Sequence, residues 1–347
     1  MNHHRFTLIL SLVLLLLSYS GTTAQDNTVT LIAHDSFNVS EDVLQAFEDE
    51  TGITVEILLA GDAGTIVNQA ILSKNNPQGD VLFGVDNTFL GRALENDIFE
   101  AYESPMLENV ASDFVLDGEH RVTPIDYGDV CLNYDKAYFA ENDLPLPESL
   151  DDLTDEAYKG LLVVENPAIS SPGLAFLLTT ISKYGEDGYL DYWESLVEND
   201  VLIVEDWTSA YYGEFSGASE GSRPLVVSYA SSPPAEVIFA EEALEEAPTG
   251  SIVADETCFR QIEFAGILNG AKNREAAEKL IDFMLSKSFQ EDVPLQMFVF
   301  PVNADAELPA EFVDYAQIPE NPVTLSVDEI NASRNEWIQS WTESVLR

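Results

Sequence analysis

Short apolar runs alternate with amphipathic segments along the N-terminal part of the chain. Val29–Ala33, Ile53–Leu59 and Asp80–Val85 have the length and composition of strands. Apolar residues recur at helical spacing in Val43–Phe47 and on one side of Thr65–Ser73. Because strands that alternate with helices in this way usually lie parallel to one another, we predict an α/β fold in which helices cover both faces of a parallel sheet.

Two later segments have the pattern of strands that cross between parts of the molecule. Val122–Gly128 leads into the apolar run Val130–Leu132, and Arg260–Leu268 is a second such strand. The chain contains no internal repeat and no low-complexity linker. We therefore expect crossover strands, rather than a flexible tether, to join the lobes and to form a hinge.

Two helices are predicted towards the C-terminus. Asn273–Gln290 is strongly periodic and is predicted as one helix. The last helix begins at Ser326–Glu329, whose residue types fit a capping box. Its apolar face is formed by Ile330, Trp337, Ile338 and Trp341.

The N-terminus has the three-part pattern of a secretory signal. Arg5 precedes the apolar run Phe6–Leu17, and small residues end at Thr22–Ala24. The run is shorter than the roughly 20 residues that span a bilayer, and no cysteine beside the cleavage site could accept a lipid. We therefore expect residues 1–24 to be a cleaved signal peptide, and the mature chain, from near Gln25, to be periplasmic or secreted.

Length and composition narrow the possible functions. A chain of 347 residues that is 46% hydrophobic can fill a larger core than one domain normally uses, so two lobes are expected. A formal net charge of -47 argues against nucleic-acid or anionic-membrane partners, which require clustered cations. The mature chain would retain only His34 and His120, which argues against a multi-histidine metal site and a histidine-dependent triad.

Acidic and hydroxyl side chains follow several predicted strands, where ligands of parallel α/β sheets bind. The candidate acids are Asp35, Asp62, Asp86 and Asp126, of which Asp62 is the strongest. The alternative for each is a solvated surface charge, because the chain has 62 acidic residues. Ser170 and Ser171 stand before a predicted helix, either as a simple N-cap or as ligand contacts; the two roles can coexist. No Walker or Rossmann glycine pattern is present, so nucleotide hydrolysis would belong to a partner protein.

Seven ordered segments of the mature chain carry a resemblance to a known family. They are Asp35–Phe37, Asp86–Asn87, Asp126–Gly128, Ser171–Leu174, Trp207–Tyr211, Ser228–Pro233 and Trp337–Trp341. Together they resemble the thiamine-binding receptors of bacterial ABC importers, within the periplasmic binding proteins that include ferric-ion receptors. The resemblance extends from about Val29 to Arg347.

This resemblance implies a two-lobe, type II-like periplasmic binding protein with a crossover-strand hinge. Lobe 1 would comprise residues 25–125 and about 262–305, and lobe 2 about 126–261 and 306–347. The implied function is a monomeric, non-enzymatic receptor without a cofactor, which captures thiamine or its phosphate esters and delivers them to an ABC permease. A receptor for ferric or another cation is the alternative within this fold, although His34 and Tyr229 are too few to support it.

The resemblance also assigns ligand contacts. In the family the ligand is held by an acidic–small pair, a hydroxyl pair, a tryptophan and a Tyr-x-x-Ser-Pro segment. The matching positions are Asp62 and Ala63, Ser170 and Ser171, Trp207, and Tyr229, Ala230, Ser231, Ser232 and Pro233. This chain departs from its close relatives in having Phe298 instead of a tryptophan, and Pro234–Ala235 instead of an aromatic residue after Ser-Pro.

The chemistry of thiamine explains these residue types. Its thiazolium ring is permanently positive, so Trp207, Tyr229 and Phe298 could each contribute roughly 0.5–2 kcal/mol by cation–π contact or stacking. The alternative for each ring is core packing. Carboxylates such as that of Asp62 could balance the charge or accept hydrogen bonds from the aminopyrimidine.

Two cysteines remain to be assigned. Cys131 and Cys258 lie on or beside the two predicted crossover strands, and an even cysteine count in an exported protein favours a disulfide. The alternative also comes from a resemblance: type I thiamine-degrading enzymes have a related two-lobe fold and use a cysteine nucleophile, for which Cys131 would be the candidate. A thiol in a disulfide cannot attack a substrate.

Overall fold

The computed structural model describes residues 27–240 and 242–346. The predicted signal peptide, residues 1–24, and the expected mature start at Gln25 lie outside the described residues. The strands are β1 (Thr28–Ala33), β2 (Thr54–Leu59), β3 (Val81–Asp86), β4 (Phe99–Glu100), β5 (Thr123–Asp135), β6 (Leu162–Glu165), β7 (Leu202–Val204), β8 (Leu225–Tyr229), β9 (Thr249–Ile252), β10 (Phe259–Leu268) and β11 (Phe300–Pro301).

The α-helices are α1 (Glu41–Thr51), α2 (Ala63–Ser73), α3 (Leu90–Glu95), α4 (Lys136–Glu141), α5 (Ser171–Tyr184), α6 (Tyr189–Glu198), α7 (Pro234–Ile238), α8 (Arg274–Met284), α9 (Lys287–Gln296), α10 (Ala310–Tyr315) and α11 (Val327–Val345). Short 3₁₀ helices span Pro105–Asn109, Ser112–Phe114, Asp151–Thr154 and Glu156–Tyr158, and a π-helical turn spans Ser209–Glu214. Within the described part of the chain, no helix is both long enough and apolar enough to cross a membrane.

The N-terminal strands form the predicted parallel arrangement. β1 lies between β2 and β3 and is parallel to both. Side chains of neighbouring strand residues point to opposite faces of the sheet, and helices cover both of these faces. Leu31 packs with α1 and α8 on one face, whereas Ile32 packs with α2 and α3 on the other. The prediction of helices on both faces is confirmed here.

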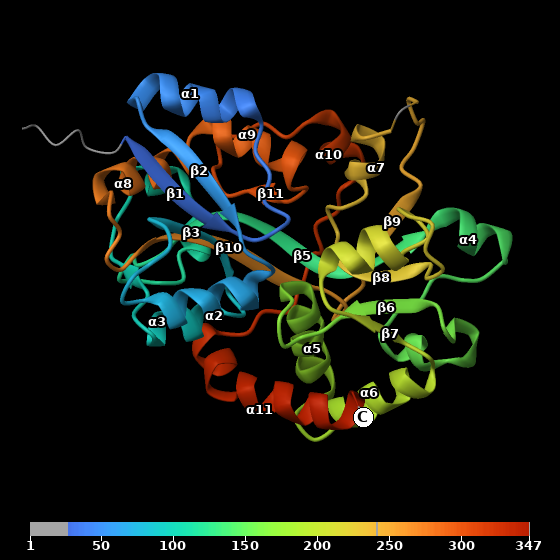
Figure 1. The fold of residues 1–347 in the computed structure, drawn as a ribbon. Coiled ribbons are helices and arrows are strands. Elements are labelled where there is room, and N and C mark those ends of the chain that lie inside the picture. The colour runs from blue at the N-terminus through green and yellow to red at the C-terminus, as the bar shows by residue number, and fades with distance from the viewer. Residues whose placement is uncertain (1–26, 241, 347) are drawn as a thin grey trace, which may run out of the picture.

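Two long strands join the halves of a mixed, curled sheet, whose main path is β2-β1-β3-β10-β5-β8-β6-β7. β10 is antiparallel to both β3 and β5, and the second half of β5 pairs with β8 and β9. Figure 1 shows β5 and β10 running between the β1–β3 end and the β6–β8 end. The fold is the expected two-lobe α/β architecture with crossover strands, but the sheet is mixed rather than wholly parallel.

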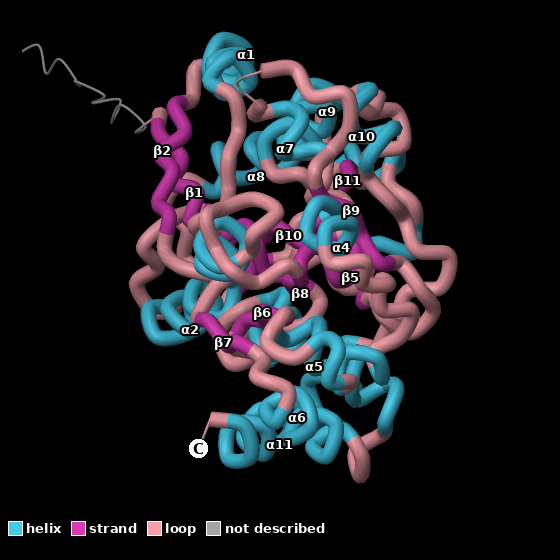
Figure 2. The backbone as a smooth tube through the Cα atoms, turned by 90° about the vertical axis from the view of Figure 1, so that its right-hand side faces the viewer, coloured by secondary structure: helices cyan, strands magenta, loops and turns pink. Residues whose placement is uncertain are grey.

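Helix α11 lies against both halves of the molecule, packing on α3 and on α6 (Figures 1 and 2). Its predicted capping box is present: Ser326 Oγ accepts from the Glu329 amide at 3.2 Å, and the Glu329 carboxylate accepts from the Ser326 amide at 3.0 Å. Trp337 and Trp341 are buried on its inner face. The sequence prediction for this helix is confirmed.

Two sequence predictions about local structure are wrong. The segment Asn273–Gln290 is not one helix: α8 ends at Met284, and Ser286 caps α9 by accepting from the Phe289 amide at 3.4 Å. Asp126 does not lie at a strand end, because Thr123–Asp135 is one continuous strand. A single long strand is needed there because its first half pairs with β10 and its second half with β8.

Candidate ligand-binding site

One cavity collects residues from both halves of the sheet. Its water-accessible volume is about 50 Å³. Six predicted residues line it: Asp62, Ser171, Trp207, Tyr229, Ser232 and Phe298. His34, Ser36 and Glu263 also line it, together with Pro172, Met297 and Val299. None of these lining residues is lysine or arginine, so the cavity presents carboxylates, aromatic rings and the His34 imidazole to a ligand.

The Trp207 ring is held in place by its neighbours. Its Nε1 donates to Ser228 Oγ at 2.9 Å, and its face stacks on Tyr211 with a centroid distance of 5.1 Å and an interplanar angle of 17°. Tyr211 is itself fixed, because its hydroxyl donates to Glu236 at 2.7 Å. Tyr211 covers one face of Trp207, Tyr212 packs edge-on against the ring at 5.4 Å, and the surface that these two rings leave uncovered lines the cavity.

Two further rings complete the aromatic wall. Tyr229 ends β8, and its hydroxyl accepts from Gln261 Nε2 at 2.9 Å. Gly128 on the neighbouring β5 makes room for this ring, since a Cβ there would lie 2.8 Å from Tyr229 Cδ1. Phe298 follows α9 with a φ of 56°, which is uncommon for a bulky residue. Its ring packs edge-on against Phe239 at 5.2 Å.

Hydroxyl groups from two loops lie beside these rings. Ser232 Oγ is 3.0 Å from Ser228 Oγ. Ser228 accepts the hydrogen bond from Trp207, and Ser232 lines the cavity, so this contact connects the tryptophan with the cavity wall. Ser171, in the first turn of α5, donates to Asp86. Ser170 is the N-cap residue of α5 but makes no side-chain cap bond; its buried hydroxyl instead lies beside the carboxylate of Asp62 and favours the ionised form of that acid. The helix therefore does not depend on that hydroxyl.

The strand register brings the buried carboxyl groups of Asp86 and Asp126 next to Glu263, which lines the cavity. Glu263 on β10 lies opposite Asp86 on β3 and opposite Asp126 on β5. His34 Nε2 is 3.6 Å from Glu263 Oε2. Burial alone would lower the pKa of His34, but the carboxylates of Glu263, Asp62 and Asp86 together raise it above its ordinary value. These carboxylates therefore favour the charged imidazolium more than water would.

The acids themselves hold protons more tightly than usual. Burial raises the pKa of Asp86 to about 6, although the hydrogen bonds from Ser171 and Thr88 act in the opposite direction. Burial and then the nearby Glu263 raise the pKa of Asp126 well above its ordinary value. Burial also raises the pKa of Asp62, against the opposing effect of His34. A cation that entered the cavity would favour the ionised form of each group.

The remaining predicted residues do not line this cavity. Asp86 and Asp126 are buried behind its walls, and Asp35 lines an adjoining hollow. Ser170 lies beside Asp62, and the others lie in nearby turns or in the core: Ala63, Ala230, Ser231 and Pro233. Ala63 starts α2 and its amide donates to Asp62 Oδ1 at 3.0 Å, while Ala230 packs against the two cysteines.

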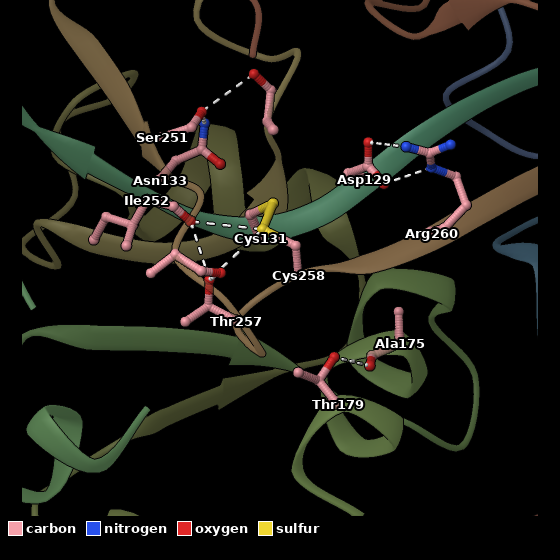
Figure 3. The surroundings of a disulfide bond; sticks show 12 residues. Asp129, Cys131, Asn133, Ala175, Thr179, Ser251, Ile252, Thr257, Cys258 and Arg260 are labelled. Carbon is pink, nitrogen blue, oxygen red and sulfur yellow. Dashed lines mark hydrogen bonds and ion pairs between the residues drawn. A yellow bond between two sulfur atoms is a disulfide. The ribbon is translucent and has the colours of Figure 1, made fainter. Parts of the chain in front are cut away.

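The disulfide prediction is confirmed. Cys131 on β5 and Cys258, just before β10, are bonded with an S–S distance of 2.06 Å, and both are buried (Figure 3). Nearby, Arg260 donates to both carboxylate oxygens of Asp129 at 2.6 and 3.0 Å, so the two crossover strands are also joined by an ion pair. The Cys131 sulfur is not a free thiol in this structure.

Glu263 and His34 were missed as site residues by sequence reasoning. Glu263 had a readable signal, since it is a charged residue in the middle of the otherwise buried strand β10. His34 directly follows β1, next to the candidate Asp35. Its partner Glu263 lies 229 positions further along the sequence. Only the strand register brings these two side chains together.

Comparison with known sequences identifies related proteins. The family model described as bacterial extracellular solute-binding protein matches residues 76–331. The thiamine-binding periplasmic protein of Salmonella typhimurium is 29% identical over 327 residues, which cover 92% of this chain and 94% of that protein. The protein of the same description from Brucella suis is 28% identical over 92% of this chain and 93% of the relative.

Solved structures give a consistent result. A periplasmic thiamin binding protein superposes with a TM-score of 0.81 at 26% identity, covering 92% of this chain and 96% of that chain. A ferric binding protein from Campylobacter jejuni has a TM-score of 0.72 at 18% identity, covering 91% of this chain and 99% of that chain. The second likeness concerns the fold alone.

Proposed function

Since the chain belongs to the bacterial extracellular solute-binding proteins, we propose that it is the substrate-binding component of an ABC importer and that it captures thiamine or a thiamine phosphate outside the cytoplasm. The relatives named thiamine-binding periplasmic protein support this choice of ligand. The periplasmic location of these relatives supports the same location for this protein, which it would reach with cleavage of residues 1–24.

The composition of the cavity is the observation that carries the proposal. Trp207, Tyr229 and Phe298 supply ring faces, while Asp62 and Glu263 supply negative charge. A flat organic cation satisfies both features at once, because a ring quadrupole and a carboxylate each attract positive charge. The hydroxyl groups of Ser171 and Ser232 are placed to contact the polar edge of such a ligand.

We further propose how the lobes move. Lobe 1, residues 25–125 and about 262–305, and lobe 2, about 126–261 and 306–347, would close over the ligand by bending at β5 and β10. The cavity draws Asp62 from the first group and Trp207 from the second, which supports closure over this site. Cys131–Cys258 would keep the two hinge strands together during this motion.

The receptor would act as a monomer that delivers its ligand to the membrane subunits of the permease. A cysteine-dependent thiamine-degrading reaction gains no support from the geometry, because Cys131 is bonded to Cys258 and both are buried. The ferric-ion alternative gains none either, since within residues 27–240 and 242–346 no group of three or more His, Cys, Asp or Glu side chains is arranged to hold a metal ion.

Calorimetric titration of the purified mature protein with thiamine tests the proposal, with ferric ion titrated in parallel. Trp207→Ala should weaken thiamine binding at least about tenfold, the equivalent of roughly 1.4 kcal/mol of lost stacking. Trp207→Phe keeps a ring face and should lose less. Mass spectrometry of the recovered ligand should show intact thiamine. Absence of thiamine binding by the unmodified protein, or turnover of the ligand, would refute the proposal.

A further inference from the structure

A second hollow adjoins the cavity and shares Ser36, Asp62 and Trp207 with it. Its remaining acids are Asp35, Glu205 and Asp206, and we call these three residues the acidic vestibule. Asp35 lies in the loop between β1 and α1, whereas Glu205 and Asp206 lie between β7 and the turn Ser209–Glu214. Carboxylates from two distant parts of the sheet therefore face the same opening.

The vestibule has no cationic side chain that could hold an anion; apart from the acids and Trp207, its polar side chains are the hydroxyls of Ser36, Thr65, Thr208 and Ser209. Neither hollow is lined by lysine or arginine, and His34, which lines the inner cavity, lies beside Glu263 and does not line the vestibule. Backbone amides of its loops are already used by the acids, since Gly61 N donates to Asp35 Oδ1 at 2.8 Å and Ser209 N donates to Asp206 Oδ1 at 2.7 Å. A phosphate that used these two amides would have to displace the carboxylates of Asp35 and Asp206.

The N-terminus of α5 is the other place where a phosphate could be held, because helix N-termini carry free amide donors. Here it offers the cavity Ser171 and Pro172. The Ser171 hydroxyl already donates to Asp86, and proline has no N–H to give. The neighbouring Gly173 is packed against the main chain of Glu165, where a Cβ would come within 2.6 Å of the carbonyl oxygen.

We propose that the acidic vestibule makes the receptor selective for free thiamine against its phosphate esters. This inference rests on the proposed function and decides between the two ligand forms that it allows. A phosphate monoester carries about -1.5 to -2 charges near neutral pH, so it reverses the net charge of the thiazolium cation. Asp35, Glu205 and Asp206 then repel the ester, while they attract the free vitamin.

Titration of the unmodified mature protein with thiamine, thiamine monophosphate and thiamine diphosphate is the first test. Thiamine should bind at least about tenfold more tightly than the monophosphate, and the diphosphate should bind more weakly still. Because the vestibule acids are partly or fully exposed, added salt should screen them and narrow the difference. Equal affinities for the three ligands would overturn the inference.

A variant that neutralises the vestibule is the second test. Asp35→Asn, Glu205→Gln and Asp206→Asn together keep the side-chain oxygen acceptors of all three positions. Monophosphate binding should strengthen at least about threefold while thiamine binding weakens slightly, because only electrostatic repulsion and attraction are removed. An unchanged ratio of the two affinities would show that the vestibule does not determine selectivity.

The matched control removes the same charges elsewhere. Glu141→Gln, Asp187→Asn and Glu198→Gln alter three exposed positions that line neither hollow. This control should leave the ratio of thiamine to monophosphate affinity at its original value. A control that changes the ratio as much as the vestibule variant would attribute selectivity to net charge and contradict the inference. Failure of all three ligands to bind would instead refute the proposed function, and the inference with it.

Discussion

Replacing Asp86 with asparagine should stabilise the ligand-free protein at neutral pH. Asp86 ends β3 and is fully buried, and its Oδ1 accepts from the amide of Thr88 at 2.6 Å and from the hydroxyl of that residue at 2.5 Å. It also accepts from Ser171. An asparagine keeps the oxygen that faces Thr88, and the Ser171 hydroxyl can rotate to accept from the new amide group. The substitution therefore removes mainly the charge.

The magnitude follows from the pKa of the buried group. Burial raises the pKa of Asp86 from 3.8 to about 6. Each pKa unit corresponds to about 1.4 kcal/mol, so the ionised carboxylate costs the folded state up to about 3 kcal/mol. Between these two pKa values the folded protein holds a proton that the unfolded chain releases. Stability therefore falls as pH rises from about 4 to about 6, and the full cost persists at higher pH.

Urea unfolding at a series of pH values, with the disulfide intact and without ligand, measures this effect. Asp86→Asn and the unmodified protein should have similar free energies of unfolding near pH 4, and the variant should become more stable by as much as about 3 kcal/mol near pH 7. Asp187→Asn, at an exposed site, should show no such divergence. Equal or lower stability of Asp86→Asn at pH 7 would refute the assignment of a buried, strained charge.

Three other outcomes are expected. Removing the disulfide by Cys131→Ala and Cys258→Ala should lower the free energy of unfolding in urea by up to about 5 kcal/mol, because the bond spans 127 positions; a loss below about 1 kcal/mol would contradict the loop-entropy account. Arg260→Met should destabilise the protein by about 3 kcal/mol, since it leaves the buried Asp129 carboxylate unpaired, and adding Asp129→Asn should restore most of that loss, as measured in the same assay. Thiamine affinity should fall as pH is lowered through about 6, because the cation favours the ionised form of Asp86. For the same reason, calorimetry in buffers of different ionisation enthalpy should detect proton release on binding. Uptake of protons would contradict this.

The sequence predicts the elements of this fold better than it predicts their directions. β1, β2, β3 and β10 lie close to the expected ranges because apolar runs of strand length identify buried strands. Periodicity carries no information about strand direction, however, so the antiparallel β10 was not foreseen. The break between α8 and α9 was missed because apolar residues continue at helical spacing through Leu285. The N-cap hydrogen bond of Ser286, which starts a new helix, is visible only in the structure.

The site was predictable where a residue type matched a segment of the family resemblance. Asp62, Trp207 and Tyr229 are positions that the resemblance assigns to the ligand, and they line one cavity; their contact with a ligand stays a prediction. Glu263 could not be placed by these means, because its role depends on cross-strand pairing with both β3 and β5. Long-range register is set by the whole sheet rather than by local sequence, and it is this register that brings the acids together.

The same acids connect binding with folding. Burial, and then the negative charges of Glu263, Asp86 and Asp62, raise the pKa of Tyr229 well above its ordinary value, so the aromatic wall lies in a negative field. In the empty protein this field opposes ionisation of Asp86 and Asp126 and destabilises the fold at neutral pH. A cation in the cavity reverses the effect, because it interacts favourably with each ionised group. Ligand binding therefore offsets part of the electrostatic cost of building the site, and this offset grows as pH rises through the pKa of Asp86.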